Sequence, residues 1–325
     1  MASIREVAQK AHVGVGTVSR ALNGSGYVSA DAKKRIDQAI EELHYMPNEL
    51  ARNFYRNRTG IIGVVIPNLD HPFFSKFTME VEMELYRHGY KTLVCNTIGI
   101  SNREQEYLEM LDRSMVDGII TGSHSLDDSS YLSHDKPIVS LDHDFGGKIP
   151  LISSDHKKGG RLAAEVLLAD GCKHVIQFAG STKVRTPAND RHVTFTQMMQ
   201  EHGVQVQTVE SAWNRFTFDY FQKTMEKFMK KYTNVDGIFT ADLPAICCLN
   251  YAKKYGRKVP EDLKIVSYDA MEITQITDPC LTAVRQDVPQ LAKACVHSIL
   301  ALIEGKPVKN MRQIFDVSLQ RGGTA

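Results

Sequence analysis

Four polar side chains near the N-terminus could form hydrogen bonds with double-stranded DNA. They lie within one short stretch and are Thr17, Ser19, Arg20 and Asn23. An arginine can donate two hydrogen bonds to one guanine, and threonine or serine hydroxyls can hold phosphate oxygens. The same hydroxyls could instead cap a helix or face solvent. The stretch therefore has the chemistry to read a base if the fold presents it on an exposed helix.

A helix-turn-helix is the element that this stretch predicts. Ser3 and Glu6 have the spacing of a capping box, so a first helix is expected to start near Ile4. A turn at 12–14, His-Val-Gly, separates it from a second helix over 15–22, where the polar side chains begin. The residues that suit the buried side of such a motif are Ala8, Val13, Val18 and Leu22.

A third helix completes a compact trihelical unit. Residues 23–26, Asn-Gly-Ser-Gly, break the second helix, and Ser29 caps the next one. The apolar positions of this third helix line one face and are Ala32, Ile36, Ala39, Ile40 and Leu43. The first sixty residues carry nine Lys or Arg against six Asp or Glu, although the whole chain has a net charge of only +1. The basic surplus therefore lies on this unit.

From Gly60 the pattern changes to short apolar runs that alternate with amphipathic stretches. The expected strands are 61–66, 92–95, 118–121, 138–141, 174–178, 235–239 and 264–268, and the expected helices include 74–87, 104–113 and 159–169. Strands without a polar face need helices on both sides of a parallel sheet, so the region predicts an α/β fold, and the strand count suggests two sheets. The polar segment 47–58 is interpreted as a linker.

Side chains that suit a sugar fall at the ends of the expected strands. A sugar ring has apolar faces and a belt of hydroxyls, so its site needs aromatic rings with carboxylates, amides and arginines. Phe73 and Phe74 follow the first strand, Asp142 and Asp269 each follow a later strand, and Gln286 lies on a late crossover. Each carboxylate alone is more often a cap or a salt bridge. Their joint position at the carboxyl ends of parallel strands indicates a pocket.

Other classes of protein are disfavoured by the motifs. Gly14-Val15-Gly16 begins like a dinucleotide fingerprint, but Ser19 takes the third glycine position and no strand precedes it. The chain has no P-loop lysine motif and no Gly-x-Ser-x-Gly elbow, so an enzyme is not expected. Its six cysteines include no Cys-x-x-Cys pair, and no cofactor or metal site is implied. Without a signal segment or a long apolar run, the chain is expected in the cytoplasm.

The N-terminal motif closely resembles the helix-turn-helix of the LacI-GalR family of bacterial repressors. The resemblance covers residues 4–23 and continues through 45–52, Tyr-Met-Pro-Asn-Glu-Leu-Ala-Arg. In that family the residues matching Val15, Gly16 and Arg20 read bases. The continuation implies further DNA contacts in the linker at Asn48 and Arg52.

The same resemblance assigns a role to the linker. In the family it folds into a hinge helix on DNA, and a leucine from each monomer wedges between base steps in the minor groove. This chain has Phe54 at that position. An aromatic ring can also unstack a base step, whereas the alternative is that Phe54 packs against the larger domain.

The remainder resembles the effector domain of this family, which shares its fold with periplasmic sugar-binding proteins. The matching segments include 63–68, 117–120, 154–155, 267–269 and 285–287. The resemblance implies that Arg191 contacts ligand hydroxyls, that Trp213 or Phe216 forms a second aromatic wall, and that Asp242 belongs to the pocket.

Two departures from the family pattern bear on the ligand. Ala241 stands where many relatives have an asparagine, and His143 stands where an arginine is common. Segments 107–111 and 116–120 look most like sucrose-operon repressors, whereas 186–191 is as close to ribose-operon repressors. The expected effector is therefore fructose or another sucrose-derived sugar, or its phosphate, with a ribose-like sugar as the alternative.

The resemblance as a whole implies a homodimeric repressor whose partners are operator DNA and a small sugar effector. Residues 1–46 would form the DNA-binding domain, 47–59 the hinge, and 60–325 the effector-binding and dimerisation domain. The domain 60–325 would divide into an N-lobe of about 60–154 and 286–312 and a C-lobe of about 155–285 and 313–325. A sugar-binding protein without DNA binding, a non-sugar effector and a protein co-repressor stay open as alternatives.

Overall fold

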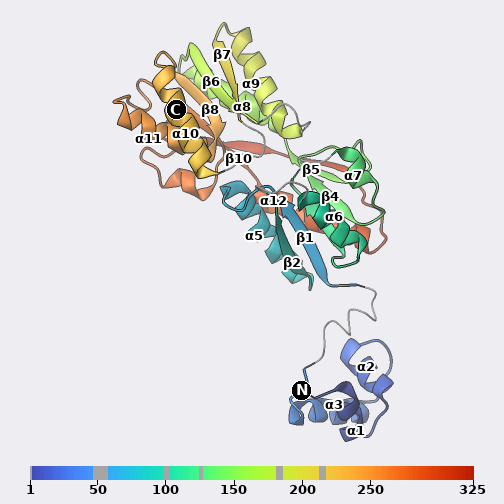
Figure 1. Cartoon of the computed structure of the whole chain (residues 1–325). Coiled ribbons are helices and arrows are strands. Elements are labelled where there is room, and N and C mark those ends of the chain that lie inside the picture. Colours follow the sequence, from blue (N-terminus) through green and yellow to red (C-terminus); the bar gives the residue numbers. More distant parts are fainter. Residues whose placement is uncertain (1, 47–57, 98–102, 124–126, 181–185, 212–216) are drawn as a thin grey trace. The chain divides into compact units, whose positions relative to one another are not determined.

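The computed structural model describes residues 2–46, 58–97, 103–123, 127–180, 186–211 and 217–325 (Figure 1). The chain forms two compact units, Met1–Thr59 and Gly60–Ala325. Five residues with an expected binding role lie outside the described residues: Asn48, Arg52, Phe54, Trp213 and Phe216.

The N-terminal unit consists of three helices, α1 (Ile4–Lys10), α2 (Val15–Asn23) and α3 (Ala30–Glu42). Helix α1 starts with the predicted capping box, in which the Ser3 amide donates to Glu6 Oε2 at 2.6 Å and the Glu6 amide to Ser3 Oγ at 3.4 Å. The Ser29 hydroxyl likewise accepts from the third residue along, Ala32. The buried core of this unit consists of Val7, Ala8, Ala11, Val18, Ile36 and Ala39. The trihelical prediction is therefore confirmed.

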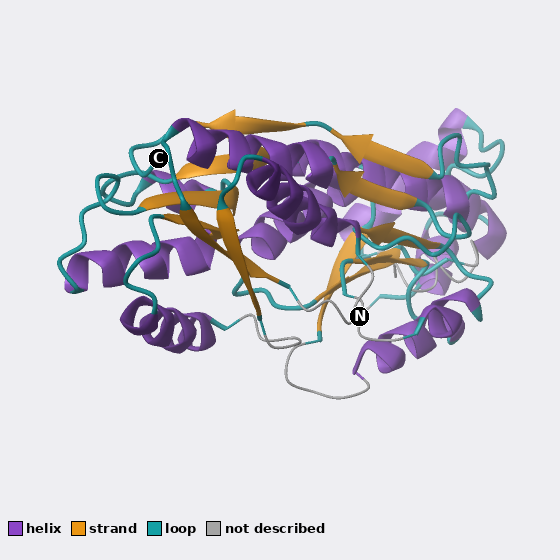
Figure 2. Cartoon of the chain, turned by 90° about the horizontal axis from the view of Figure 1, so that it is seen from above, coloured by secondary structure: helices purple, strands orange, loops and turns teal. Residues whose placement is uncertain are grey.

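The larger unit contains two six-stranded sheets, visible as two separate groups of strands in Figure 2. The first has the order β11-β5-β4-β3-β1-β2 and the second β12-β10-β9-β8-β6-β7. All pairs are parallel except β10 with β12. The strands are β1 (Ile61–Ile66), β2 (Lys91–Asn96), β3 (Gly118–Thr121), β4 (Ile138–Leu141), β5 (Leu151–Ser154), β6 (His174–Ala179), β7 (Gln205–Glu210), β8 (Gly237–Ala241), β9 (Lys264–Asp269), β10 (Thr282–Gln286), β11 (Arg312–Phe315) and β12 (Val317–Gln320). This two-sheet α/β architecture confirms the predicted fold class.

Helices cover both faces of each sheet and bury four apolar clusters between the layers. On the first sheet α5 (Pro72–Arg87) and α12 (Val288–Ile303) cover one face, and α6 (Arg103–Asp112) and α7 (Asp128–Leu132) the other. On the second sheet the pairs are α8 (His156–Ala169) with α9 (Asp190–Glu201) and α10 (Phe218–Lys231) with α11 (Asp242–Lys254). Short 3-10 turns span Pro187–Asn189 and Glu272–Gln275. None of the described helices has the length and apolar character needed to cross a membrane.

The chain passes between the lobes three times, after β5, after β10 and after β11. The first sheet therefore takes its last strand, β11, from a segment that ends at Phe315, three residues beyond the expected lobe boundary. Strand β8 also begins two residues later than expected. The side chain of Asp236, just before the strand, accepts hydrogen bonds from the Lys173 and His174 amides at 2.8 and 2.9 Å.

Two adjacent glycines of α8 allow close approaches, Gly159 to the Tyr268 ring of β9 and Gly160 to the start of α9. A Cβ atom at Gly159 would lie 2.7 Å from the Tyr268 ring, and one at Gly160 would overlap the backbone carbonyl of Arg191. Since backbone cannot rotate away as a side chain can, Gly160 fixes where α9 begins.

We expect Gly160→Ala to lower the free energy of unfolding of the larger unit by about 1–3 kcal/mol, because the added methyl group overpacks the α8–α9 contact. Urea denaturation followed by circular dichroism measures the effect. Arg161→Ala, at the next and exposed position, serves as the control and should stay within roughly 0.5 kcal/mol of the parent. A Gly160→Ala midpoint equal to that of the control would contradict the close approach.

Candidate functional site

Helix α2 presents the expected DNA-contacting side chains on an exposed face of the N-terminal unit. Val15 is 42% exposed, Arg20 is exposed, and a Cβ atom at Gly16 would meet nothing within 4 Å. Neither hydroxyl caps α2, since the N-cap is Gly14. Instead, Thr17 Oγ1 accepts from Arg20 Nη2 at 3.4 Å and Ser19 Oγ accepts from Asn23 Nδ2 at 3.2 Å. Thr17 and Ser19 therefore hold the two longer side chains along the helix surface.

A second group of polar residues lies at the carboxyl ends of the strands in the larger unit. Asp142 follows β4 directly and accepts from Ser153 Oγ at 2.5 Å, and its Oδ1 is 2.9 Å from His156 Nε2. The other ring nitrogen of His156 lies 2.8 Å from the Tyr268 hydroxyl. Because Asp142 follows a strand of the first sheet and Tyr268 lies in the second, this chain of hydrogen bonds joins the two lobes.

A second bridge between the lobes runs through Gln286. Its Oε1 accepts from Ser154 Oγ at 2.6 Å, and its Nε2 donates to Asp269 Oδ1 at 2.7 Å. Ser154 ends a strand of the first sheet, whereas Asp269 and Gln286 end neighbouring strands of the second. All three are buried. The amide is therefore satisfied on both sides and fixes the lobes at the edge where a ligand would lie.

Arg191 supplies the positive charge of this region. Its guanidinium lies over the Tyr268 ring, 4.3 Å from the centroid, and the glycine pair of α8 permits that approach. Its charge lowers the pKa values of both Asp142 and Asp269, and it joins burial, the larger cause, in lowering the pKa of His71 to about 4. The structure thus brings Asp142, Arg191, Asp269 and Gln286 into one electrostatic environment.

The two acids of this cluster differ in their proton affinity. Burial alone would raise the pKa of Asp142, but His156, Ser153 and Arg191 together hold it below its ordinary value. For Asp269 burial dominates and raises the pKa to about 6, with Arg191 and Gln286 acting in the opposite direction. Asp142 therefore stays ionised at neutral pH, whereas Asp269 gains or loses its proton near pH 6.

Backbone strain is concentrated at the same strand ends. The φ angles of Asp142, Asp269 and Ala270 are 58°, 102° and 54°. Non-glycine residues rarely adopt such values, which cost about 1–3 kcal/mol each and gather at ligand sites. From these positions both carboxylates accept the hydrogen bonds that join the lobes.

Two expected pocket residues have packing roles. Phe73 is 5% exposed and belongs to the core of the first lobe, where its ring stacks on Phe77. Asp242 is buried, accepting from Ser267 Oγ at 2.7 Å and from the Met271 amide at 2.8 Å, so that it holds the turn after β9. Phe74, in contrast, is only partly buried and lies beside the backbone of Gly122.

Several residues of this cluster were not expected from the sequence. His156 and Tyr268 complete the first bridge, Ser154 the second, and the buried His71 ring lies 5.4 Å from the Phe74 ring. The available signal was that Ser154 and Tyr268 lie at the ends of strands and that His71 and His156 lie at the starts of the helices that follow strands. His143 points elsewhere, with Nε2 2.6 Å from Asp128 Oδ1.

A cavity of about 710 Å³ opens beside the crossovers and is lined in part by Lys76, Arg285, Asp316 and Gln286. Neither Asp142 nor Arg191 lines it. Lys76 forms ion pairs with Glu80 and Glu272, at 3.4 and 3.0 Å, and Asp316 pairs with a lysine of α8. The charges of Lys76 and Asp316 are therefore paired, and the cavity adjoins the cluster between the lobes at Gln286.

Comparisons with known proteins identify the family. Residues 3–48 match the family described as bacterial regulatory proteins, lacI family, and residues 164–324 match the periplasmic binding protein-like domain. The chain is 36% identical over 313 residues to the ribose operon repressor of Halalkalibacterium halodurans, covering 96% of this chain and 93% of that protein. It is 34% identical over 306 residues to the sucrose operon repressor of Streptococcus mutans, covering 94% and 93%.

Solved structures show the same architecture. The lac repressor dimer bound to operator and an anti-inducer superposes with a TM-score of 0.85 at 23% identity, covering 99% of this chain and 98% of that one. A LacI-type protein from Alkaliphilus metalliredigens in complex with D-xylulofuranose gives a TM-score of 0.74 at 28% identity, covering 82% and 99%. The protein belongs to the lacI family of bacterial regulatory proteins. It is a DNA-binding transcriptional regulator of that family.

We expect the contribution of Asp269 to the stability of the larger unit to fall as the pH rises from about 4 to about 7, and the difference between the parent and an Asp269 variant isolates it from the opposite contribution of the buried His71. Because burial raises the pKa of Asp269 to about 6, the folded state holds this proton more tightly than the unfolded chain does. Ionising the group therefore costs stability, by up to about 3 kcal/mol. Asp269→Asn should flatten this dependence and exceed the parent in stability at about pH 8, as measured by urea denaturation. Asp219→Asn, on the exposed surface of α10, should keep the parental pH profile; identical profiles for both variants would refute the assignment.

Proposed function

We propose that this protein is a homodimeric repressor of a sugar-utilisation operon, released from or held on its operator by a sugar bound between the lobes. The observation that carries the proposal is the cluster at the facing strand ends, in which Asp269 and Gln286 are buried and Asp142 and Arg191 are half-buried beside them. Carboxylates, an amide and a guanidinium match the hydroxyls of a sugar, and Phe74 offers an aromatic face. Phe73 and Asp242 support this group from behind.

The charges favour an uncharged sugar as the effector. Among the described residues of the cluster, one guanidinium faces two carboxylates, so ionisation of both acids leaves a negative surplus. A furanose sugar such as fructose or ribose, or a sucrose-derived sugar, satisfies these groups without adding negative charge. The names of the similar repressors, ribose operon and sucrose operon, point to the same class. Sugar phosphates are therefore compared with the uncharged sugars in the ligand screen described below.

Residues 1–46 are proposed as the DNA-reading head, 47–59 as the hinge and 60–325 as the effector-binding and dimerisation domain. In the head Val15, Gly16 and Arg20 read bases. Thr17, Ser19 and Asn23 support these contacts or hold phosphates, and Asn48, Arg52 and Phe54 contact DNA from the hinge. Since its target is operator DNA, the protein acts in the cytoplasm, and it has no catalytic role and no cofactor in this function.

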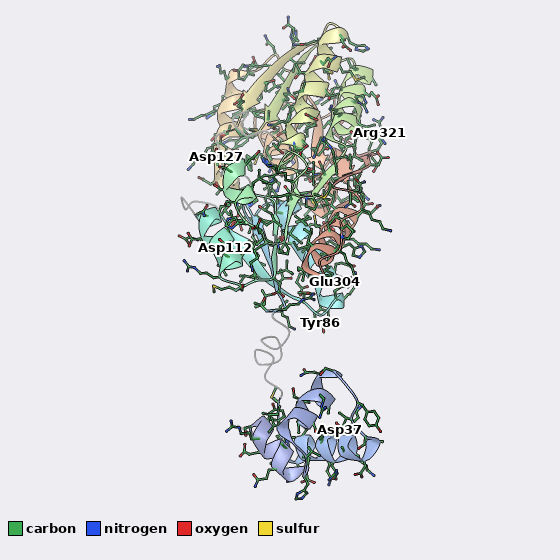
Figure 3. The ribbon with its side chains drawn as sticks, turned by 90° about the vertical axis from the view of Figure 1, so that its right-hand side faces the viewer. Asp37, Tyr86, Asp112, Asp127, Glu304 and Arg321 are labelled. Carbon is green, nitrogen blue, oxygen red and sulfur yellow. The ribbon has the colours of Figure 1, made fainter. Side chains whose placement is uncertain are left out.

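One face of the first lobe is proposed as the dimer interface. Met79, Met83 and Tyr86 recur at helical spacing on α5 and are 44%, 41% and 68% exposed, and Val94 on β2 is 41% exposed. Tyr86, labelled in Figure 3, points away from the fold. Such an apolar face fits a second copy of the chain, and two heads are needed to span two half-sites of an operator.

The central experiment is a screen of sugars by thermal shift, followed by operator binding. Fructose, sucrose, ribose and their phosphates are each added to the purified protein, since a ligand that binds only the folded state raises the melting temperature. The operator is first selected from random duplexes. A sugar that raises Tm should change operator affinity by about 5- to 150-fold. A protein without preference for any duplex at physiological salt would refute the repressor function.

The main alternative is a sugar-binding protein that does not bind DNA. Removal of residues 1–58 separates the two, because the larger unit should keep its sugar response and lose operator binding. Unchanged DNA binding by the truncated chain would contradict the assignment of the head. A response to a non-sugar ligand alone would retain the regulator and exclude the sugar.

We expect Arg20→Ala to weaken specific operator binding by about 5- to 150-fold, since one bidentate contact to guanine is worth roughly 1–3 kcal/mol. Binding to random duplex should change much less. Fluorescence anisotropy with both duplexes measures the two effects. Arg35→Ala, on the exposed surface of α3, is the control and should retain operator affinity. Equal losses on both duplexes would remove Arg20 from base reading.

We expect Arg191→Lys to reduce sugar affinity at least about tenfold while operator binding is kept. A lysine retains the charge but loses the planar fork that can bond two hydroxyls and lie over Tyr268. Calorimetry with the sugar found in the screen measures the loss. Arg161→Lys, an exposed arginine on α8, should behave as the parent does, and a parental sugar affinity in Arg191→Lys would place the ligand elsewhere.

A further inference from the structure

Two histidines and a glutamate meet where α5 packs against α12. Glu84 and His88 lie one turn apart at the C-terminal end of α5, and His297 lies on α12. The Nε2 atom of each histidine is 3.4 Å from Oε1 of Glu84. The three ligand atoms all lie within 4.8 Å of one another, and the described part of the chain holds no second group of this kind.

The spacing of these atoms matches the ligand shell of a small divalent cation. Zinc binds nitrogen and carboxylate oxygen at about 2.0–2.1 Å, so two corners of its tetrahedron lie about 3.4 Å apart. Both distances from the histidines to Glu84 already have this value. The two imidazole nitrogens lie within 4.8 Å of each other, and their side chains are 42% and 52% exposed, so that they can adjust to the ion.

Arg87 prepares the glutamate for this role. Its Nη1 lies 2.6 Å from Oε2 of Glu84, which leaves Oε1 toward the two imidazoles. This hydrogen bond is also the main reason that the pKa of Glu84 lies below its ordinary value, with partial burial acting in the opposite direction. The carboxylate is therefore ionised and oriented, as metal ligands are by their outer hydrogen bonds.

Ion pairing between protonated histidines and Glu84 would explain the cluster less well. Charge-assisted N–H···O bonds are about 2.7–2.9 Å long, whereas both histidine contacts are 3.4 Å. Two imidazolium rings would also repel each other across a ring separation of 5.8 Å. Neutral rings around a cation avoid that repulsion.

We propose that Glu84, His88 and His297 form a binding site for a first-row divalent transition metal ion such as Zn²⁺, with water completing the shell. Two imidazoles with one carboxylate select such an ion over Mg²⁺ and Ca²⁺, which prefer oxygen ligands alone. The bound ion would cross-link α5 to α12 and stabilise the first lobe. The site is independent of the proposed sugar response, and the sequence did not indicate it because His297 lies 209 residues beyond His88.

Calorimetry on the full chain tests the site. The protein is treated with a chelator, desalted and titrated with ZnCl₂ in one experiment and MgCl₂ in another. We expect one Zn²⁺ per chain at this site, a loss of affinity of at least about tenfold in His297→Gln and in His88→Gln, and no response to Mg²⁺. His202→Gln is a matched control, since His202 ends α9 as His88 ends α5, and it should leave the affinity unchanged.

A spectroscopic measurement identifies the ligands. Cobalt bound by nitrogen and oxygen shows d–d absorption without a thiolate charge-transfer band, and Cys280→Ser, which removes the exposed cysteine, should leave the spectrum unaltered. Circular dichroism checks that each variant folds without metal, as expected for exposed histidines. Zinc affinity and cobalt spectra in the His88→Gln/His297→Gln double variant equal to those of the parent would overturn the proposal, as would a thiolate band that vanishes in Cys280→Ser.

Discussion

Burial of charge between the two lobes is the constraint on which the rest of the larger unit depends. Asp269 is buried and Asp142 and Arg191 are half-buried beside it, and an isolated charge in such a place would be costly. The cost is offset by mutual attraction and by hydrogen bonds from His156 and Gln286. Since the partners come from both sheets, the charges are satisfied only while the lobes keep their relative position.

The strand topology fixes the relative position of the two lobes. Each parallel sheet presents its carboxyl ends at one edge, and three chain crossings hold the two edges together. A ligand that supplies hydroxyls to the same groups competes directly with the bridges between the lobes. The equilibrium of the lobes and the occupancy of the cleft are then linked, which is the physical requirement for an allosteric regulator.

Local sequence determined much of the architecture. The capping box of Ser3 and Glu6 and the strands β1, β3 and β4 appear with the expected bounds. Caps depend on residues three positions apart, and buried strands of a parallel sheet are continuous apolar runs, so both are visible in a few neighbouring residues. The family was likewise readable from the N-terminal motif, because contacts to DNA depend on side-chain types along one short helix.

Tertiary structure alone decided the rest. Strands β5, β7, β10, β11 and β12 were not expected. The edge strands β7, β11 and β12 carry exposed polar residues and so do not form continuous apolar runs. The orientation that buries Phe73 but leaves Phe74 near the cleft depends on how α5 packs. The bridge from Asp142 to Tyr268 joins residues more than one hundred positions apart. Such contacts depend on how the two sheets pack against each other, and the types of a few neighbouring residues in the sequence do not indicate that packing.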